Sequence, residues 1–88
     1  MEFEWDRAKA LANLRKHGVD FADAANVFLD PFMQECEDRG PRDEVRFNAL
    51  GMVWNRLLFV VYTERSGRIR IISARKATRH ERRQYHEG

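Results

Sequence analysis

The chain has 88 residues, of which 43% are hydrophobic and 34% are charged, and its net charge is +2. This length and hydrophobic content suffice for one core and exclude a second. No apolar run reaches the roughly 18 residues of a membrane-spanning helix, and the acidic amino terminus is unlike a signal peptide. Cys36 is the single cysteine, which excludes an internal disulfide and a cysteine-cluster metal site. We therefore expect one reduced, cytoplasmic domain over residues 1–88.

A short strand at residues 3–5 and a helix are predicted first. Asp6 is a good N-cap for the helix, and Gly18 is a typical stop signal after its last turn. Leu11 and Leu14 mark the apolar side of this helix.

A second helix is predicted from Asp20, and Asp30-Pro31 ends it, because proline disfavours helical backbone in the residue before it. Its core-facing stripe follows the spacing i, i+3, i+4, i+7, i+8. The stripe consists of Phe21, Ala24, Ala25, Phe28 and Leu29.

Residues 32–75 predict an antiparallel meander. The candidate strands are "FMQECE", "EVRFNAL", "RLLFVVYTE" and "RIRIISAR", separated by turns at 38–43, 51–55 and 64–67. The third of these strands is apolar on both faces, which indicates a central position in the sheet.

A short helix closes the chain. Thr78 and Glu81 form a capping box, which predicts a helix start at this point. The residues that follow are polar nearly all round, so the helix cannot be held by core burial alone. We expect it to dock through Ala77 and Tyr85, or to be steadied by a ligand or partner.

Basic residues gather at the carboxy-terminal end. Residues 1–64 hold 8 Lys and Arg against 12 Asp and Glu, whereas residues 65–88 hold 8 against 2. Of the basic side chains 13 are Arg and 3 are Lys, and the planar fork of arginine suits bidentate phosphate contacts. The pattern indicates one anion-binding surface, and a solvated charged face is the alternative.

The last strand and its junction with the helix form the candidate phosphate site. Alternation places Arg68 and Arg70 on the face opposite Ile69 and Ile71, away from the predicted helices. The alternative for Arg68 is an edge-strand charge that discourages aggregation. The candidate RNA-binding set is Arg65, Arg68, Arg70, Arg75, Lys76, Arg79, Arg82 and Arg83.

RNA cleavage by the 2′-hydroxyl needs a base, an acid and stabilisation of the extra phosphate charge. Arginines supply the last, and the candidate proton carriers are His17, Glu64, His80, Tyr85 and His86. Each also has a structural alternative: His17 as a helix cap, Glu64 as a turn ion pair, Tyr85 as a helix anchor, and the other two as solvated side chains. No metal-ligand spacing or phosphate loop is present in the sequence, so we expect neither metal nor cofactor.

The chain resembles the BrnT family of type II toxins. The resemblance rests on "FEWDRAKALANLRKHGVDFADAANVFLDP", "EVRFNALG", "RLLFVVYTERSGRIRIISARKAT" and "ERRQYHEG", which cover nearly the whole chain in order. The hairpin "GMVWNR" is more apolar than the family pattern and is interpreted as a contact with the antitoxin or a second copy.

The resemblance implies an α+β fold of the RelE type, with two N-terminal helices on an antiparallel sheet of about four strands and a short C-terminal helix. It implies a metal-independent endoribonuclease that inhibits translation. It also implies a BrnA antitoxin that forms a two-toxin, two-antitoxin complex and binds operator DNA itself. Arg79 and Tyr85 match the family arrangement, with Arg75 closing the last strand, and we add His17 and Glu64 as catalytic candidates. A non-catalytic nucleic-acid-binding or partner-binding module is the alternative.

Overall fold

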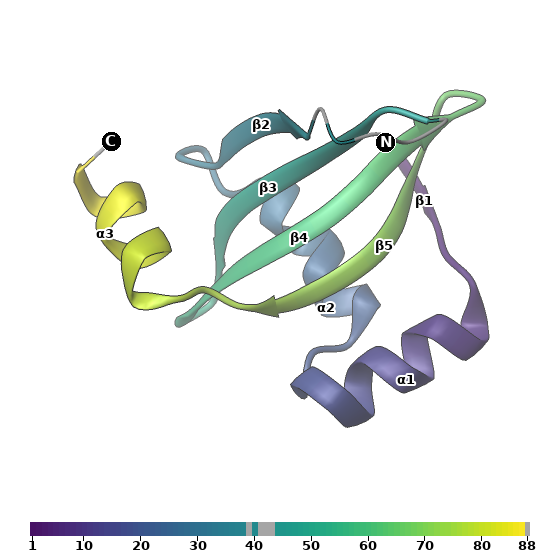
Figure 1. Cartoon of the computed structure of the whole chain (residues 1–88), viewed down its shortest axis with the longest axis horizontal. Coiled ribbons are helices and arrows are strands. Elements are labelled where there is room, and N and C mark those ends of the chain that lie inside the picture. The colour runs from purple at the N-terminus through teal and green to yellow at the C-terminus, as the bar shows by residue number, and fades with distance from the viewer. Residues whose placement is uncertain (39, 41–43, 88) are drawn as a thin grey trace.

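The computed structural model describes residues 1–38, 40 and 44–87 (Figure 1). Within them a five-stranded sheet runs in the order β1-β5-β4-β3-β2. The predicted turn at 38–43 lies mostly outside the described residues. No helix in the described part of the chain is both long enough and apolar enough to cross a membrane. The elements are β1 (Glu2–Glu4), α1 (Arg7–His17), α2 (Phe21–Ala24), the 3-10 helix η1 (Ala25–Leu29), β2 (Gln34–Asp38), β3 (Arg46–Val53), β4 (Arg56–Arg65), β5 (Arg68–Lys76) and α3 (Arg79–Glu87).

The sheet is mixed, which corrects the prediction of about four antiparallel strands. β2, β3, β4 and β5 form the expected antiparallel meander, with β4 flanked by β3 and β5. β1 adds a fifth strand that runs parallel to β5, with Phe3 beside Ile69. The prediction missed this pairing because a three-residue strand carries almost no periodicity and its partner strand lies at the other end of the chain.

The caps of α1 are confirmed, but its predicted apolar side is wrong. The Asp6 carboxylate accepts a hydrogen bond from the Lys9 N–H at 3.0 Å, and Gly18 ends the helix with a φ of 70°. Leu11 and Leu14 remain 51% and 43% exposed. The face of α1 that meets the sheet is therefore not the face that carries its leucines.

Asn13 is the buried side chain of α1, and it fixes the helix to the edge of β5. Its Nδ2 donates to the carbonyl oxygens of Val19 at 3.0 Å and Ala74 at 2.8 Å. Its Oδ1 accepts from the Ala74 N–H at 3.1 Å. β1 pairs with β5 only along residues 68–70, so Asn13 occupies the place of a neighbouring strand farther along the same edge.

The second predicted helix is shorter than expected. Asp20 caps it as predicted, accepting from the Ala22 N–H at 2.9 Å, and Phe21 is fully buried. Beyond Ala24 the chain tightens into η1, and Leu29, expected in the core stripe, is 79% exposed. The apolar spacing of a regular α-helix therefore holds only for its first part.

Gly51 accounts for the close packing of η1 on β3. A Cβ at this position would lie 3.1 Å from both the Cβ and the carbonyl oxygen of Val27. The sequence pattern placed Gly51 in a turn, but β3 continues to Val53 and only Trp54 and Asn55 turn the chain. The glycine is therefore needed for the approach of η1 and not for the turn.

Two apolar clusters hold the layers together. The larger one lies between the sheet and the N-terminal helices and includes Tyr62, Phe21 and Ile71. The smaller one lies on the other face of the sheet and joins Leu50, Leu57 and Ala77, with Met52, Phe59 and Tyr85 packed around it. The second cluster confirms that α3 docks through Ala77 and Tyr85.

Candidate functional site

The first turn of α3 is set by its capping box, as predicted. The Thr78 N–H donates to Glu81 Oε1 at 2.9 Å, and the Glu81 N–H donates to Thr78 Oγ1 at 3.2 Å. This reciprocal pairing gives a side-chain acceptor to two backbone N–H groups at the helix start, those of Thr78 and Glu81. It also places the Glu81 carboxylate against the end of β5.

Arg75 is held at this junction by two neighbours. Its Nη1 and Nη2 donate to the two Glu81 oxygens at 2.8 and 3.0 Å, and its guanidinium carbon lies 4.2 Å from the centre of the Phe59 ring. The hydrogen bonds from Arg75 lower the pKa of Glu81 and raise the pKa of Arg75. A rigid, charged guanidinium therefore lies on the open face of the sheet, opposite the N-terminal helices.

Tyr85 is anchored to Asp30, the residue that follows η1. The Tyr85 hydroxyl donates to Asp30 Oδ2 at 2.5 Å, and the same oxygen accepts from the Met52 N–H at 2.7 Å. This hydrogen bond is the main reason that the pKa of Tyr85 rises to about 12. The pKa of Asp30 is lowered, because the hydrogen bonds from Met52, Tyr85 and Phe32 together outweigh the opposing effect of burial. Tyr85 is thus protonated at neutral pH and acts as a hydrogen-bond donor.

The linkage between Tyr85 and Asp30 predicts a loss of stability at high pH. The pKa of Tyr85 is about 12 in the folded protein, whereas in the unfolded chain it is near the usual value of 10.0. Between these values the native state binds more protons, so the free energy of unfolding falls as pH rises. Denaturant unfolding of wild type and Tyr85→Phe, below pH 10 and between 10 and 12, measures this difference. Tyr62 is present in both proteins, so its contribution cancels in the comparison. Equal slopes of the free energy of unfolding against pH, for wild type and Tyr85→Phe, would disprove the linkage.

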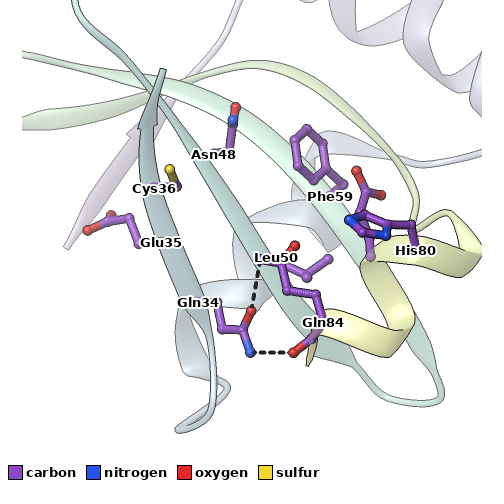
Figure 2. Close-up of a pocket in the computed structure, with 9 residues that line it drawn as sticks. Gln34, Glu35, Cys36, Asn48, Leu50, Phe59, His80 and Gln84 are labelled. Atoms are coloured by element: carbon purple, nitrogen blue, oxygen red, sulfur yellow. Dashed lines mark hydrogen bonds between the residues drawn. The ribbon is translucent and has the colours of Figure 1, made fainter. Parts of the chain in front are cut away.

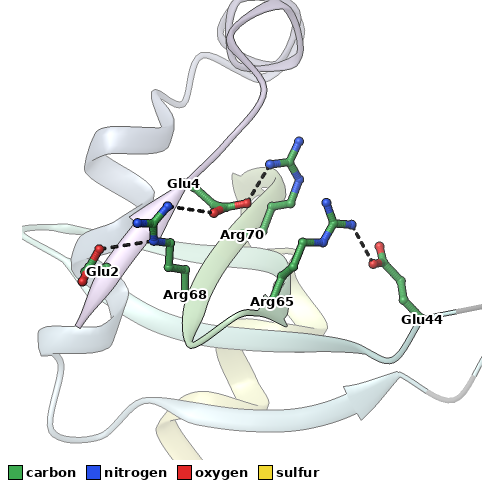
Figure 3. A network of polar contacts seen from close by, with 6 residues as sticks. All are labelled: Glu2, Glu4, Glu44, Arg65, Arg68 and Arg70. Carbon is green, nitrogen blue, oxygen red and sulfur yellow. Dashed lines mark hydrogen bonds and ion pairs between the residues drawn. The ribbon is translucent and has the colours of Figure 1, made fainter.

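Part of the predicted basic surface is neutralised by acidic side chains. Three arginines of the β4–β5 hairpin and β5 face carboxylates from β1 and from the segment before β3 (Figure 3). The pairs of Arg65 and Arg68 are solvent-exposed, so each contributes little to stability and can exchange for another anion. The pair of Arg70 with Glu4 is half-buried, with side chains 29% and 26% exposed. The three pairs are Arg65–Glu44 at 3.0 Å, Arg68–Glu2 at 3.2 Å and Arg70–Glu4 at 2.9 Å.

The remaining predicted cations lie on or next to α3. All four are exposed and, among the described residues, none forms an ion pair. Together with Arg75 they give this end of the molecule a concentrated positive charge beside the start of a helix, where anions are favoured. They are Lys76, Arg79, Arg82 and Arg83.

The structure does not bring Glu64 or His17 to Arg75, and Tyr85 lines a different hollow, with Phe32 and Gln34. Glu64 lies five positions after Phe59 on β4, roughly 17 Å away at strand spacing and on the opposite face of the sheet. His17 ends α1 and shares a shallow hollow with Lys16, Ile72 and Ser73 that no α3 residue lines.

His80 lies closer to the arginine than either of these residues. It belongs to the first turn of α3 and lines the same cleft as Glu81 and Phe59 (Figure 2). His80 is exposed, which agrees with the solvated role that the sequence favoured. Nothing in the local pattern shows that the start of α3 lies over β4. Its position two residues after Thr78, the helix cap, is the one signal that could have placed His80 in the first turn of α3 together with Glu81.

A metal site would need several ligand side chains close together within the described residues. No group of three or more His, Cys, Asp and Glu side chains in that part of the chain is arranged to hold a metal ion. The carboxylates of Glu2, Glu4 and Glu81 each bind a guanidinium group.

Fold and charge together define a small α+β protein with one strongly basic C-terminal helix packed over the open face of its sheet. A family model described as the ribonuclease toxin BrnT of type II toxin–antitoxin systems matches residues 5–81. The match covers most of the chain, which therefore belongs to the BrnT family of ribonuclease toxins. No curated protein matches the sequence.

Proposed function

We propose that this protein is a metal-independent endoribonuclease that cleaves RNA and thereby inhibits translation. The observation that carries the proposal is the group of exposed cations around Arg75, at the junction of β5 and α3, which form no ion pair with another described residue. Phosphate contacts through arginine and lysine supply most of the affinity of proteins for nucleic acids. RNA therefore binds first along α3, and Arg65, Arg68 and Arg70 extend the contact when their carboxylate partners are displaced.

Arg75 and Arg79 are assigned to the reacting phosphate. Attack by the 2′-hydroxyl adds negative charge to the phosphate, and preorganised guanidinium donors stabilise that charge. This role replaces the electrostatic contribution of a metal ion, which is the basis for proposing metal independence.

His80 and Tyr85 are assigned to proton transfer. An imidazole can accept and donate a proton at neutral pH, and His80 lines the cleft next to Arg75. Tyr85 carries its proton at neutral pH and donates it in a hydrogen bond to Asp30, so it anchors α3 and does not act as the base. A part in proton transfer requires its hydroxyl to leave Asp30. His17 and Glu64 lie elsewhere and have no part in the proposed reaction.

The protein is further proposed to pair with a BrnA-type antitoxin in a complex of two toxins and two antitoxins. A type II toxin family implies a protein antitoxin, and operator DNA would then be bound through the antitoxin alone. Large apolar side chains are exposed and available for such a contact: Trp54 is 85% exposed with a φ of 56°, and Phe32 is 75% exposed. A strained, solvent-exposed tryptophan contributes little to the fold of the free protein and fits a partner contact.

A non-catalytic RNA-binding module is the second candidate. It is favoured by the separation of His17 and Glu64 from Arg75, because binding alone needs no proton carriers near the arginines.

Incubation of the purified protein with RNA, with and without EDTA and ribosomes, separates the two candidates. Wild type is expected to cut RNA in EDTA and to leave 2′,3′-cyclic phosphate ends, whereas Arg79→Ala combined with Tyr85→Phe cuts far more slowly. Arg15→Ala removes an exposed arginine of α1 and is the matched control, with wild-type activity expected. Binding without cleavage under every condition would support the second candidate and reject the enzyme.

A further inference from the structure

A cleft of about 240 Å³ lies between α3 and the open face of the sheet (Figure 2). Its floor is made by side chains that share this face on β2, β3 and β4, since Gln34 pairs with Leu50 and Leu50 with Phe59. The volume is below the roughly 300–1,000 Å³ of pockets for drug-sized ligands, so it suits one small group. The lining residues are Gln34, Cys36, Asn48, Leu50, Phe59 and, from α3, His80, Glu81 and Gln84, with Glu35 at the margin.

The cleft combines an apolar floor with one free amide. Leu50 and Phe59 supply the apolar floor. The side chains of Gln34 and Gln84 bind each other at 3.3 Å and hold one end of the cleft in place. Asn48 is half-buried, and its side chain forms no hydrogen bond within the described part of the chain. Its amide can therefore both donate to and accept from a ligand.

The cleft also adjoins the candidate phosphate site. Phe59 is shared between them, because its ring lines the cleft while the Arg75 guanidinium lies 4.2 Å from its centre. A ligand with a planar apolar group in the cleft and an anion next to it would meet both sites. A nucleotide has this composition, since its base is planar, carries hydrogen-bonding edges and is linked to a phosphate.

We propose that this cleft binds one nucleobase of the RNA, next to the phosphate held by Arg75. The base packs against the part of Phe59 that lines the cleft and is not covered by Arg75. The Asn48 amide pairs with its edge, as asparagine does with adenine in nucleic-acid complexes. This inference rests on the proposed ribonuclease function and adds the source of its sequence preference.

Cys36 provides a test of binding that does not depend on cleavage. It is the single cysteine of the chain, it is exposed, and it lines the cleft. A base in the cleft is expected to slow alkylation of its thiol by about 10-fold at roughly ten times the dissociation constant of the ligand. The probes are the four nucleoside 3′-monophosphates, with inorganic phosphate and ribose 5-phosphate as controls. Protection by all six, or by none, overturns the proposal.

Asn48→Ala and Phe59→Leu test the two assigned contacts, with Asn55→Ala in the exposed β3–β4 turn as the matched control. Both cleft variants are expected to weaken nucleotide protection by about 10-fold, and Asn48→Ala also reduces the preference among cleavage sites by about 10-fold. Cleavage with an unchanged site preference in Asn48→Ala rejects the base site and leaves the ribonuclease intact. Protection of Cys36 in a protein that cuts no RNA would reject the ribonuclease and keep the base site.

Discussion

Arg75→Ala is expected to lower the rate of RNA cleavage by about 10²- to 10³-fold, the effect of removing one preorganised donor from a developing anion. Arg75 is fixed before substrate arrives, because Glu81 binds both terminal nitrogens and Phe59 lies beneath the guanidinium. An RNA phosphate must either approach the remaining face of the guanidinium or displace Glu81. Single-turnover cleavage of a defined RNA measures the loss without contributions from product release.

Glu81→Gln separates the role of Arg75 in charge stabilisation from its role in holding α3. Glutamine can still complete the capping box with Thr78, so the helix start is retained while the ion pair with Arg75 is lost. We expect cleavage by this variant to remain within about 10-fold of wild type, since Arg75 keeps its charge and its place on Phe59. If Glu81→Gln loses as much activity as Arg75→Ala, the arginine serves the fold and not the reacting phosphate.

Local patterns in the sequence predict most of the fold because they arise from interactions between residues that lie close together in the chain. The alternation at the start of β5 follows from one buried face, and β4 is apolar on both faces because it is central. The caps of α1, α2 and α3 are made by residues within three positions of each other. The same reasoning locates Arg75, at the end of a strand, and the capped helix that follows it. The basic junction was therefore predictable from sequence.

The contacts that complete the site are not local and leave no periodic signal. Asp30 was interpreted as a helix stop before proline, yet its carboxylate binds Tyr85, 55 positions later. Phe59 and Asn48 read as ordinary strand residues until the register of β2, β3 and β4 places them under α3. A polar asparagine within a helix likewise gives no indication that its partner is a strand edge.

Asn13→Ala is expected to lower the free energy of unfolding by about 2–4 kcal/mol, a large share of the stability of a small domain. The substitution removes three buried hydrogen bonds and leaves the N–H and carbonyl of Ala74 without partners. Alanine has the higher helix propensity, by about 0.5 kcal/mol, so the expected loss occurs in spite of a more stable helix. Leu14→Ala, at an exposed position of the same helix, is expected to cost less than about 1 kcal/mol in denaturant unfolding.

The same substitution links the edge of the sheet to the site, because Ala74 directly precedes Arg75. In Asn13→Ala the end of β5 loses its partner on the α1 side while β4 still pairs with it. Hydrogen exchange at the Ala74 amide should therefore accelerate more than exchange at Ile69, whose strand neighbour β1 is unchanged. Cleavage should fall in the same variant at temperatures where it is fully folded, since the strand end that positions Arg75 is less constrained. Unchanged exchange at Ala74 would show that Asn13 only fills space beneath α1 and has no part in holding Arg75.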